Sequence, residues 1–526
     1  MKILLTRLRG KQGFKRHIPW HYGFYKDLLE TEGHTFDFID NQVEEYTVQE
    51  LVDIVLDNNY SLACVSGVAF IYNDLKVFVE LLKAKRKDIL VVVGGHVVAD
   101  HEFILNSCPV DIVVFGEGEV TIPKIVSCIE ANDSLDAVPG IAFKKDNEVF
   151  LTEREKQYAV MDDLPLVNPE SFKLDKYNSK INAICLIDEK AIRFKEEGHK
   201  AASFIASRGC THTCFFCYRH QKGYRSYSKG RLEENIKVLK DSNYSFLLFS
   251  DELMTADEKR LKDLCGLMKK YGIYWIGSGR ANQITIEIVE MLKESNCCQF
   301  FVGVESFDPK MLKQMYKKVT PQQNITAVNM LYQYGIFCRL ALIIGAPGED
   351  RQTIYSTRQG LWSCYFFGDI IDCAYLSPFP GSPSYYFGLK NGYIKDARYV
   401  HEELIEKNDL VINFSKLSNL ELAAWHNWLY CEAAISHRVK HYALNIDQPF
   451  LIILKEFLIS YSKLLFKEPV NFLMLNLYIL KGFNYWLKPV KKLKWAEFRE
   501  TLLVPKRLSL RRSLKKRLRR IFATDS

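Results

Sequence analysis

The chain has 526 residues, 48% of them hydrophobic, and this length and composition predict several globular domains and exclude a disordered protein. Its fourteen cysteines, with no signal-peptide-like apolar stretch at the start, indicate a reducing, cytoplasmic location and not a disulfide scaffold. No long uninterrupted apolar run occurs, so we expect no membrane span. The net charge of +8 is concentrated at the end, because nine Lys or Arg fall between Lys506 and Arg520.

Residues 1–135 alternate short apolar strands with amphipathic helices, such as 23–32 and 72–85, a pattern that predicts a parallel α/β sheet. Sheets of this kind bind ligands beyond the carboxyl ends of their strands, where glycines let a ligand approach the backbone. The expected strands are 2–5, 35–39, 62–66, 90–93 and 112–115, and the candidate ligand-binding residues after them are Ser66, Gly67, Gly94, Gly95, His96, Gly116, Glu117 and Gly118.

These loops resemble the cobalamin-binding domain that precedes the catalytic domain in one class of radical S-adenosylmethionine (SAM) enzymes. The Gly-Gly pair at 94–95 and the Gly-Glu-Gly-Glu segment at 116–119, followed by Thr121, carry the resemblance. It implies a Rossmann-like, flavodoxin-like cobalamin-binding domain. Many cobalamin domains offer cobalt a histidine within Asp-x-His-x-x-Gly, but the nearest histidine, His21, lacks that context, as is common in this class. A receiver-type domain of flavodoxin-like fold is the alternative.

Residues 136–197 form a connector between the predicted domains. Its Pro-Gly and Lys-Asp-Asn-Glu segments predict a small hairpin followed by an irregular lead-in. We assign no chemistry to this connector.

Three cysteines, Cys210, Cys214 and Cys217, stand at spacings of four and three on one short segment. Thiolates suit iron–sulfur clusters, and three of them leave one iron of a [4Fe–4S] cube open to a ligand. The aromatic pair at 215–216 would shield the cube from water. The alternatives are a zinc site or three unlinked cysteines, but zinc sites usually combine two CxxC pairs or closely spaced histidines, and no second pair stands nearby.

This CxxxCxxC spacing, with the aromatic Phe216 before the last cysteine, resembles the cluster loop of radical SAM enzymes. The resemblance implies that the open iron chelates SAM, that an electron from the cluster releases a 5′-deoxyadenosyl radical, and that Phe216 belongs to the SAM site. It also implies a partial (β/α)6 TIM-type barrel over residues 198–400, which the strand–loop–helix pattern supports. The expected strands are 201–206, 245–252, 275–280, 300–306 and 339–346.

Further motifs follow these strands in the order found in the family. The acidic pair Asp251 and Glu252 resembles one that holds the amino group of SAM, although Asp-Asp is more usual, and helix capping by Asp251 is the alternative. Arg280 falls where the family places an arginine facing the SAM carboxylate. Glu305, in a GxES motif, corresponds to a glutamate near the ribose and sulfonium. Two segments that resemble the GxPGE and PxPGT motifs complete the series: 345–349 and 376–383.

The apolar periodicity of residues 401–504 predicts a mostly helical C-terminal domain with an amphipathic helix at 420–441. In the family such helices cap the barrel mouth and select the substrate, and their apolar content here suggests an apolar or amphipathic one. Three histidines share helical spacing on that helix, and we favour a solvated face over a metal site for His426, His437 and His441.

Residues 505–526 form a basic amphipathic tail, for which we weigh peripheral contact with an anionic membrane equally against a solvated segment. Nucleic acid is less expected because interleaved aromatic residues are missing.

Together these features predict a cobalamin-dependent radical SAM enzyme with a [4Fe–4S] cluster, SAM and cobalamin as cofactors. The favoured activity is methylation of an unactivated carbon in a lipid or natural-product substrate, with an electron donor such as flavodoxin or ferredoxin. A radical cyclase or rearrangement enzyme is the first alternative. A non-catalytic iron–sulfur or cobalamin sensor is the alternative of another class. A methylthiotransferase is less expected because no N-terminal cysteine trio is suited to a second cluster.

Overall fold

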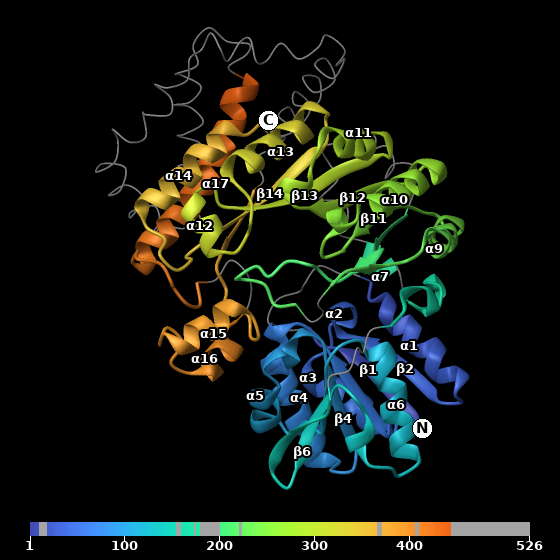
Figure 1. The fold of residues 1–526 in the computed structure, drawn as a ribbon. Helices are drawn as coiled ribbons and strands as arrows, with labels where there is room; N and C mark the ends of the chain where they lie inside the picture. Colours follow the sequence, from blue (N-terminus) through green and yellow to red (C-terminus); the bar gives the residue numbers. More distant parts are fainter. Residues whose placement is uncertain are drawn as a thin grey trace, which may run out of the picture. The chain divides into compact units, whose positions relative to one another are not determined.

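The computed structural model divides into two units, Met1–His437 and Arg438–Ser526. Two sheets with their helices make up the first unit (Figure 1). The basic tail and most of the predicted C-terminal domain lie outside the described residues. The structure describes residues 1–9, 18–153, 159–172, 175–178, 200–219, 223–365, 371–404 and 410–442.

The first sheet contains five parallel strands in the order β2-β1-β3-β4-β5, which is the order of the flavodoxin-like fold that the resemblance implies. The hairpin expected in the connector is present, and it extends this sheet as the antiparallel strands β6 and β7. Because the five parallel strands run in one direction, their carboxyl ends share one edge. The strands are β1 (Lys2–Arg7), β2 (Thr35–Asp40), β3 (Leu62–Ser66), β4 (Leu90–Gly94), β5 (Ile112–Val114), β6 (Ile141–Lys145) and β7 (Glu148–Leu151).

Helices cover both faces of this sheet (Figure 1). Successive strand residues point to opposite faces, so Leu4 packs in one apolar cluster with α3, α4 and α5, while Ile3 and Leu5 pack in another with α1 and α6. A capping box between Thr47 and Glu50 fixes the start of α3. The helices are α1 (Trp20–Thr31), α2 (Asn41–Glu44), α3 (Val48–Asp57), α4 (Tyr72–Lys85), α5 (His101–Ser107) and α6 (Gly118–Glu130).

The second sheet contains six parallel strands in sequential order, with β8 at one edge and β15 at the other. A curled sheet of parallel strands joined by helices is the predicted partial (β/α)6 barrel. The strands are β8 (Lys200–Phe204), β11 (Tyr244–Phe249), β12 (Tyr274–Gly279), β13 (Cys297–Glu305), β14 (Phe337–Ile344) and β15 (Asp372–Tyr375). The helices are α9 (Lys229–Asp241), α10 (Glu258–Tyr271), α11 (Ile286–Glu294), α12 (Pro309–Gln314), α13 (Pro321–Gln333), α14 (Arg351–Ser363), α15 (Pro383–Lys390), α16 (Ala397–Glu403) and α17 (Asn419–Tyr442).

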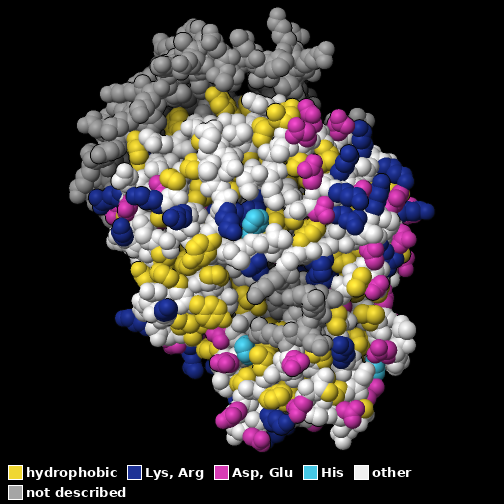
Figure 2. All heavy atoms as spheres, viewed as in Figure 1, with side chains coloured by type: hydrophobic (Ala, Val, Ile, Leu, Met, Phe, Trp, Pro, Cys, Tyr) yellow, Lys and Arg dark blue, Asp and Glu magenta, His cyan; other side chains and the backbone are white. Residues whose placement is uncertain are grey.

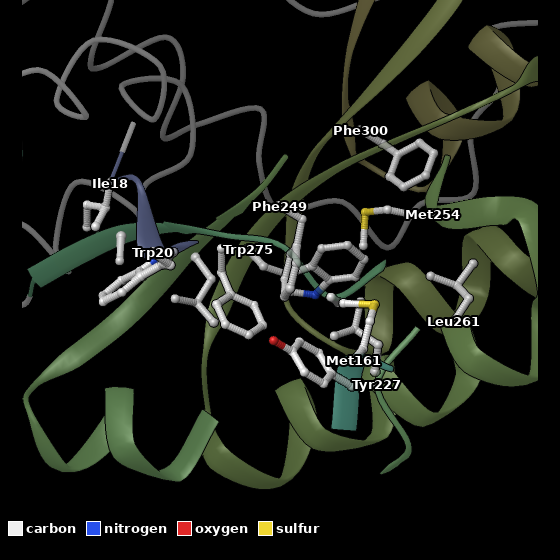
Figure 3. Close-up of a cluster of buried hydrophobic side chains, with 14 of the residues drawn as sticks. Ile18, Trp20, Met161, Tyr227, Phe249, Met254, Leu261, Trp275 and Phe300 are labelled. Carbon is white, nitrogen blue, oxygen red and sulfur yellow. The ribbon is translucent and has the colours of Figure 1, made fainter. Parts of the chain in front are cut away.

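Large aromatic side chains fill the core beneath the barrel strands. Trp275 is fully buried on β12, and Phe249 packs edge-on against it with ring centroids 5.7 Å apart (Figure 3). Ile18 and Trp20, from the start of the chain, belong to the same apolar cluster (Figure 3). The Ile18 N–H also donates to Ser203 Oγ on β8 at 2.9 Å. The N-terminal segment therefore packs into the barrel core.

The helix α17 confirms the prediction for residues 420–441, and Leu429 and Ala433 lie on its buried face. The expectation of a solvated histidine face is wrong for His426, which is buried. Its Nε2 lies 3.0 Å from the Cys373 carbonyl oxygen, and its ring stacks on Tyr375 with centroids 4.4 Å apart. The side chains of the other two histidines lie outside the described residues. No helix within the described ranges is long and apolar enough to cross a membrane.

Candidate active site

The three cysteines follow strand β8, at the carboxyl end where barrel sites lie. The base of their loop is fixed by a short antiparallel pairing of β9 (Ser207–Arg208) with β10 (Arg225–Ser226). Gly209 has a φ of +84°, and a Cβ there would lie 2.5 Å from the Gly223 carbonyl oxygen. Only glycine fits this close approach, so the loop path depends on it.

The donor set of this loop fits an iron–sulfur cluster. Cys214 is buried, and Cys210 and Cys217 are half-buried. Burial, with smaller contributions from the neighbouring thiols, raises the pKa of Cys217 to about 12. Among the described residues, no three His, Cys, Asp or Glu side chains converge as they do around a single metal ion. In a cube each cysteine binds a different iron, so its ligands stand farther apart than around one ion.

Phe215 and Phe216 lie between the second and third cysteines, as the shielding hypothesis requires. Phe215 is buried in an apolar cluster with Met311 and Met315, and its N–H donates to the Met315 carbonyl oxygen at 3.0 Å. Phe216 is half-buried, with the Lys317 ammonium 5.8 Å from its ring centroid. Apolar side chains therefore back one side of the cysteine loop.

Arg280 reaches the cysteine loop from the end of β12. Its Nη1 donates to Cys214 Sγ at 3.4 Å, and its Nη2 donates to the Lys317 carbonyl oxygen. The Arg280 Nε is buried and finds no partner among the described residues. A buried guanidinium N–H without a partner suits an anionic ligand such as a carboxylate. This geometry fits the role predicted for Arg280 toward SAM.

Glu305 forms a buried ion pair with Lys317, whose Nζ lies 2.7 Å from Glu305 Oε1. The backbone of Glu305 has a φ of +62°, an uncommon conformation that often marks functional sites. A Cβ on Gly303 would lie 2.5 Å from Glu305 Oε1, so the glycine of the GxES motif makes room for the ion pair. The sequence reasoning missed Lys317, because a basic pair after a short helix usually lies on the surface. The glycine before Glu305 was the available signal.

Asp251 and Glu252 lie just beyond β11 and differ in their surroundings. Asp251 is buried and accepts hydrogen bonds from the Ala206 N–H at 3.0 Å and from the Ser207 hydroxyl, while burial raises its pKa to about 6. The alternative of helix capping is wrong, since Asp257 caps α10. The carboxyl group of Asp251 instead fastens the start of the cysteine loop. Glu252 is exposed, and its side chain remains available to a ligand.

The glycines expected to approach cobalamin lie together at the carboxyl edge of the first sheet. Gly95 has a φ of +83°, and a Cβ there would lie 2.6 Å from the Gly67 carbonyl oxygen and 3.3 Å from Ser66 Oγ. Gly116 also has a positive φ, of 86°. A Cβ on Gly118 would collide with the Tyr25 hydroxyl, 2.4 Å away. A side chain at Gly95 or Gly118 would therefore clash with neighbouring protein atoms, so glycine lets the chain pack closely at this edge. Also at this edge are Gly94, at the end of β4, and His96 and Glu117 in the following loops.

The carboxylate of Glu117 is directed toward the base of the cysteine loop. It is buried and pairs with Arg208 Nη1 at 2.9 Å and Arg225 Nη2 at 2.7 Å, and it accepts the Ala159 N–H at 2.7 Å. Burial alone would raise the pKa of Glu117, but the two arginines outweigh it and hold the pKa below its usual value. Glu119 pairs with Arg208 at 2.8 Å. The Gly-Glu-Gly-Glu segment is therefore ion-paired to the two strands at the base of the cysteine loop.

Tyr218 directly follows the third cysteine. It contacts residues of two other predicted motifs, His96 and Gly381. The His96 ring lies edge-on to it, with centroids 5.7 Å apart. A Cβ on Gly381, in the segment that resembles PxPGT, would lie 2.6 Å from the Tyr218 ring and 2.9 Å from Ala99. His21 lies on α1, where burial, with smaller contributions from Arg208 and Arg7, lowers its pKa to about 3. The edge of the first sheet and the cysteine loop thus adjoin.

Two family models match the chain in the places that the motifs indicate. Residues 25–126 match the B12 binding domain, and residues 204–359 match the radical SAM superfamily. The chain therefore carries a radical SAM domain together with a B12-binding domain. The radical SAM domain implies a [4Fe–4S] cluster and SAM, and the B12-binding domain implies cobalamin.

Several curated proteins are similar to this chain over 64–75% of its length. A protein named an uncharacterized methyltransferase, from Pyrococcus horikoshii, is 25% identical over 75% of this chain and 84% of its own length. The hopanoid C-3 methylase of Methylococcus capsulatus is 25% identical over 73% of this chain and 71% of its own. An anaerobic magnesium-protoporphyrin IX monomethyl ester cyclase of Rubrivivax gelatinosus is 25% identical over 64% of this chain and 58% of its own.

Two solved structures share the fold. The radical SAM methyltransferase TsrM from Kitasatospora setae, with cobalamin and a [4Fe–4S] cluster bound, superposes with a TM-score of 0.64 at 14% identity, covering 82% of this chain and 90% of that one. The cobalamin-dependent SAM radical enzyme OxsB, with aqua-cobalamin and SAM bound, superposes with a TM-score of 0.63 at 17% identity. This superposition covers 93% of this chain and 73% of that one.

Proposed function

We propose that this protein is a cobalamin-dependent radical SAM methyltransferase that methylates an unactivated carbon of a small-molecule substrate. The observation that carries the proposal is the contact between the expected cobalamin edge and the cysteine loop. Glu117 and Glu119 are ion-paired to Arg208, two residues before the first cysteine, and His96 adjoins Tyr218. This contact supports the proposal, because two cofactors bound at these neighbouring elements would both be close to one substrate.

Within this proposal the side chains bind, orient and shield. When bound, the cluster supplies the electron that cleaves SAM, and cobalamin carries the methyl group to be transferred. The three cysteines hold the cluster, and the free Nε–H of Arg280 is positioned to bind the SAM carboxylate. Glu252 is available to the SAM amino group, and the apolar cluster around Phe215 keeps water from the loop. A radical reaction needs no strong general base, and we assign none.

The substrate class that we propose is an apolar lipid or a natural product. The hopanoid C-3 methylase among the relatives carries a lipid substrate in its name, and the apolar composition of the C-terminal region agrees with such a molecule. The tryptophan bound to TsrM in another solved structure, at 14% identity, shows that a structural neighbour binds a small polar molecule instead.

A radical cyclisation or rearrangement is the second candidate, and one specific observation favours it. The relatives include an anaerobic magnesium-protoporphyrin IX monomethyl ester cyclase that is as similar in identity as the methylase. The two candidates differ in the fate of SAM, since methylation consumes two SAM molecules and leaves S-adenosylhomocysteine beside 5′-deoxyadenosine.

The experiment that tests the proposal uses SAM labelled with deuterium in its methyl group. The reconstituted protein is incubated anaerobically with a reductant and a panel of apolar lipids and natural products, and products are analysed by mass spectrometry. We expect a product that carries the labelled methyl group, with S-adenosylhomocysteine and 5′-deoxyadenosine in equal amounts. A product without label, formed with 5′-deoxyadenosine alone, contradicts methylation and favours the cyclase.

A further inference from the structure

We propose that the surface formed by α12, the turn after it and the start of α13 is the docking site for an acidic, one-electron carrier protein that reduces the cluster. This inference rests on the proposed function, because it names the partner that supplies one electron for each SAM cleaved. The carrier is oxidised by one electron and the cluster is reduced by one. The surface is defined by Thr213, Pro309, Leu312, Lys313, Tyr316, Lys318, Val319, Thr320, Pro321 and Gln323, which line an open cavity of about 760 Å³.

The charge of this surface is positive. Lys313 and Lys318 are exposed and have no acidic partner in the described part of the chain. Residues 309–348 contain no Asp or Glu, and no acidic side chain lines the cavity. Lysine and arginine side chains beside hydrophobic patches are visible on the face drawn in Figure 2. Unpaired cations around an apolar hollow are complementary to an acidic protein surface and speed its association.

The backbone of the turn between α12 and α13 has an uncommon conformation. Tyr316 and Lys318 have positive φ angles of 54° and 51°, whereas Lys317 between them is buried. Such conformations are costly for non-glycine residues and persist where the surroundings impose them. Here the turn directs Lys317 inward to Glu305 and exposes its two neighbours. One short segment therefore builds the buried ion pair and the outer surface at once.

This surface adjoins the cysteine loop. Tyr316 is 50% exposed, and its ring lies edge-on to Phe215 with centroids 5.9 Å apart. Phe215 stands directly after Cys214, and its N–H donates to Met315 at 3.0 Å. Thr213, on the other side of Cys214, lines the cavity itself. Electron transfer between proteins weakens steeply with distance, so a carrier seated here would be close to the cluster.

The composition of the surface also suits a transient partner. Electron-transfer complexes bury little area, commonly less than about 1,200 Å², and depend on charge for their formation. A hollow with an exposed aromatic ring and exposed lysines matches such an encounter better than a permanent interface, which would present a larger apolar face.

The test measures binding and electron delivery with an acidic flavodoxin as the probe. The charge-reversal pair Lys313→Glu/Lys318→Glu is compared with Lys259→Glu/Lys262→Glu on α10, which makes the same charge change with exposed lysines outside the cavity. At low ionic strength we expect the first pair to weaken flavodoxin binding at least tenfold and to slow cluster reduction by flavodoxin similarly. The milder pair Lys313→Gln/Lys318→Gln should show an intermediate loss, and added salt should remove the differences.

A small chemical reductant separates this inference from the proposed function. With dithionite and methyl viologen, every variant should form 5′-deoxyadenosine from SAM at the wild-type rate, because the cluster site is untouched. Loss of SAM cleavage in the wild type under these conditions would contradict the proposed function, while the binding data would still report on the surface. Equal flavodoxin binding by wild type, the cavity variants and the α10 variants would overturn the docking site.

Discussion

Lys317 connects two residues that were expected to contact SAM. Its ammonium pairs with the buried Glu305, and its carbonyl oxygen accepts a hydrogen bond from Arg280, which also donates to Cys214. A buried carboxylate without a partner is strongly destabilising, so the buried glutamate depends on this lysine as its ionic partner. We interpret Lys317 as a positioning residue for the candidate SAM site.

Replacing Lys317 with methionine should therefore leave Glu305 buried and unpaired. We expect Lys317→Met to lower the free energy of unfolding by roughly 3 kcal/mol. SAM affinity, measured by equilibrium dialysis, should also fall. Lys318→Met is the matched control, because it removes an exposed charge one residue away and should change stability by less than about 0.5 kcal/mol. Equal stabilities of the two variants in urea would contradict a structural role for the buried pair.

Glu349 makes the stability of the folded chain depend on pH. It is buried beside β14, its carboxylate accepts the Gly345 N–H, and burial raises its pKa to about 8 against an ordinary value of 4.5. The folded chain thus keeps a proton that the unfolded chain loses. The stabilising contribution is complete below about pH 4.5 and is lost as the pH rises toward 8.

Glu349→Gln should flatten that loss, because an amide does not titrate. Between pH 5 and pH 8 we expect the wild type to lose more unfolding free energy than the variant, by up to about 4 kcal/mol. Urea unfolding at several pH values, with the two proteins side by side, checks this. Parallel stability curves would show that Glu349 does not titrate in this range.

At the scale of elements, the Gly-Glu-Gly-Glu segment joins the first sheet to the cysteine loop. The motif lies at the start of α6, and its first glutamate pairs with one arginine on β9 and one on β10. The same two strands form the base of the loop that carries the cysteines. A motif expected to bind cobalamin through its backbone thus uses its side chains to hold two elements together.

Glu117→Gln should weaken this connection while preserving the shape of the side chain. It removes the carboxylate that pairs with Arg208 and Arg225, and we expect a loss of roughly 1–3 kcal/mol in unfolding free energy together with faster proteolysis of the 223–228 segment. Glu148→Gln on β7 is the control, since that exposed glutamate has no ion pair in the described structure. Indistinguishable behaviour of the two variants would remove the connecting role.

The elements themselves follow from local patterns in the sequence. Apolar alternation and helical periodicity locate the third strand at 62–66 and the helix at 72–85 with the bounds that the structure has. Long-range pairings do not follow from such patterns. The connector hairpin joins the first sheet, and the last barrel strand, at 372–375, is too short to have an unambiguous signal.

The candidate site also combines features that local sequence motifs predict with features that depend on long-range contacts. Cysteine spacing and strand-end motifs bring the correct loops together, because parallel strands end at one edge. Lys317, the ion pairs of Glu117 and the use of Asp251 as a loop anchor depend on side chains far apart in sequence. Burial of His426 also depends on packing against β15, which its helical periodicity does not reveal.

At the scale of the whole molecule, the two cofactor sites should load independently. Cys214→Ala removes one thiolate of the proposed cluster site but leaves the carboxyl edge of the first sheet unchanged. We expect reconstituted iron and sulfide contents to fall severalfold while cobalamin binding, followed by its visible absorption, stays near the wild-type level. Cys265→Ala on α10, which removes a buried thiol outside the loop, should retain its iron. Loss of iron in both variants would point to general unfolding instead.

The most direct test of the account is SAM cleavage by the reconstituted full chain. The protein is loaded anaerobically with iron, sulfide and hydroxocobalamin, its spectrum is recorded, and SAM is added with dithionite and methyl viologen. We predict a spectrum with both cofactors and the formation of 5′-deoxyadenosine, measured by mass spectrometry. A protein that holds both cofactors and binds SAM, yet forms no 5′-deoxyadenosine, would contradict the account and leave a sensor in place of an enzyme.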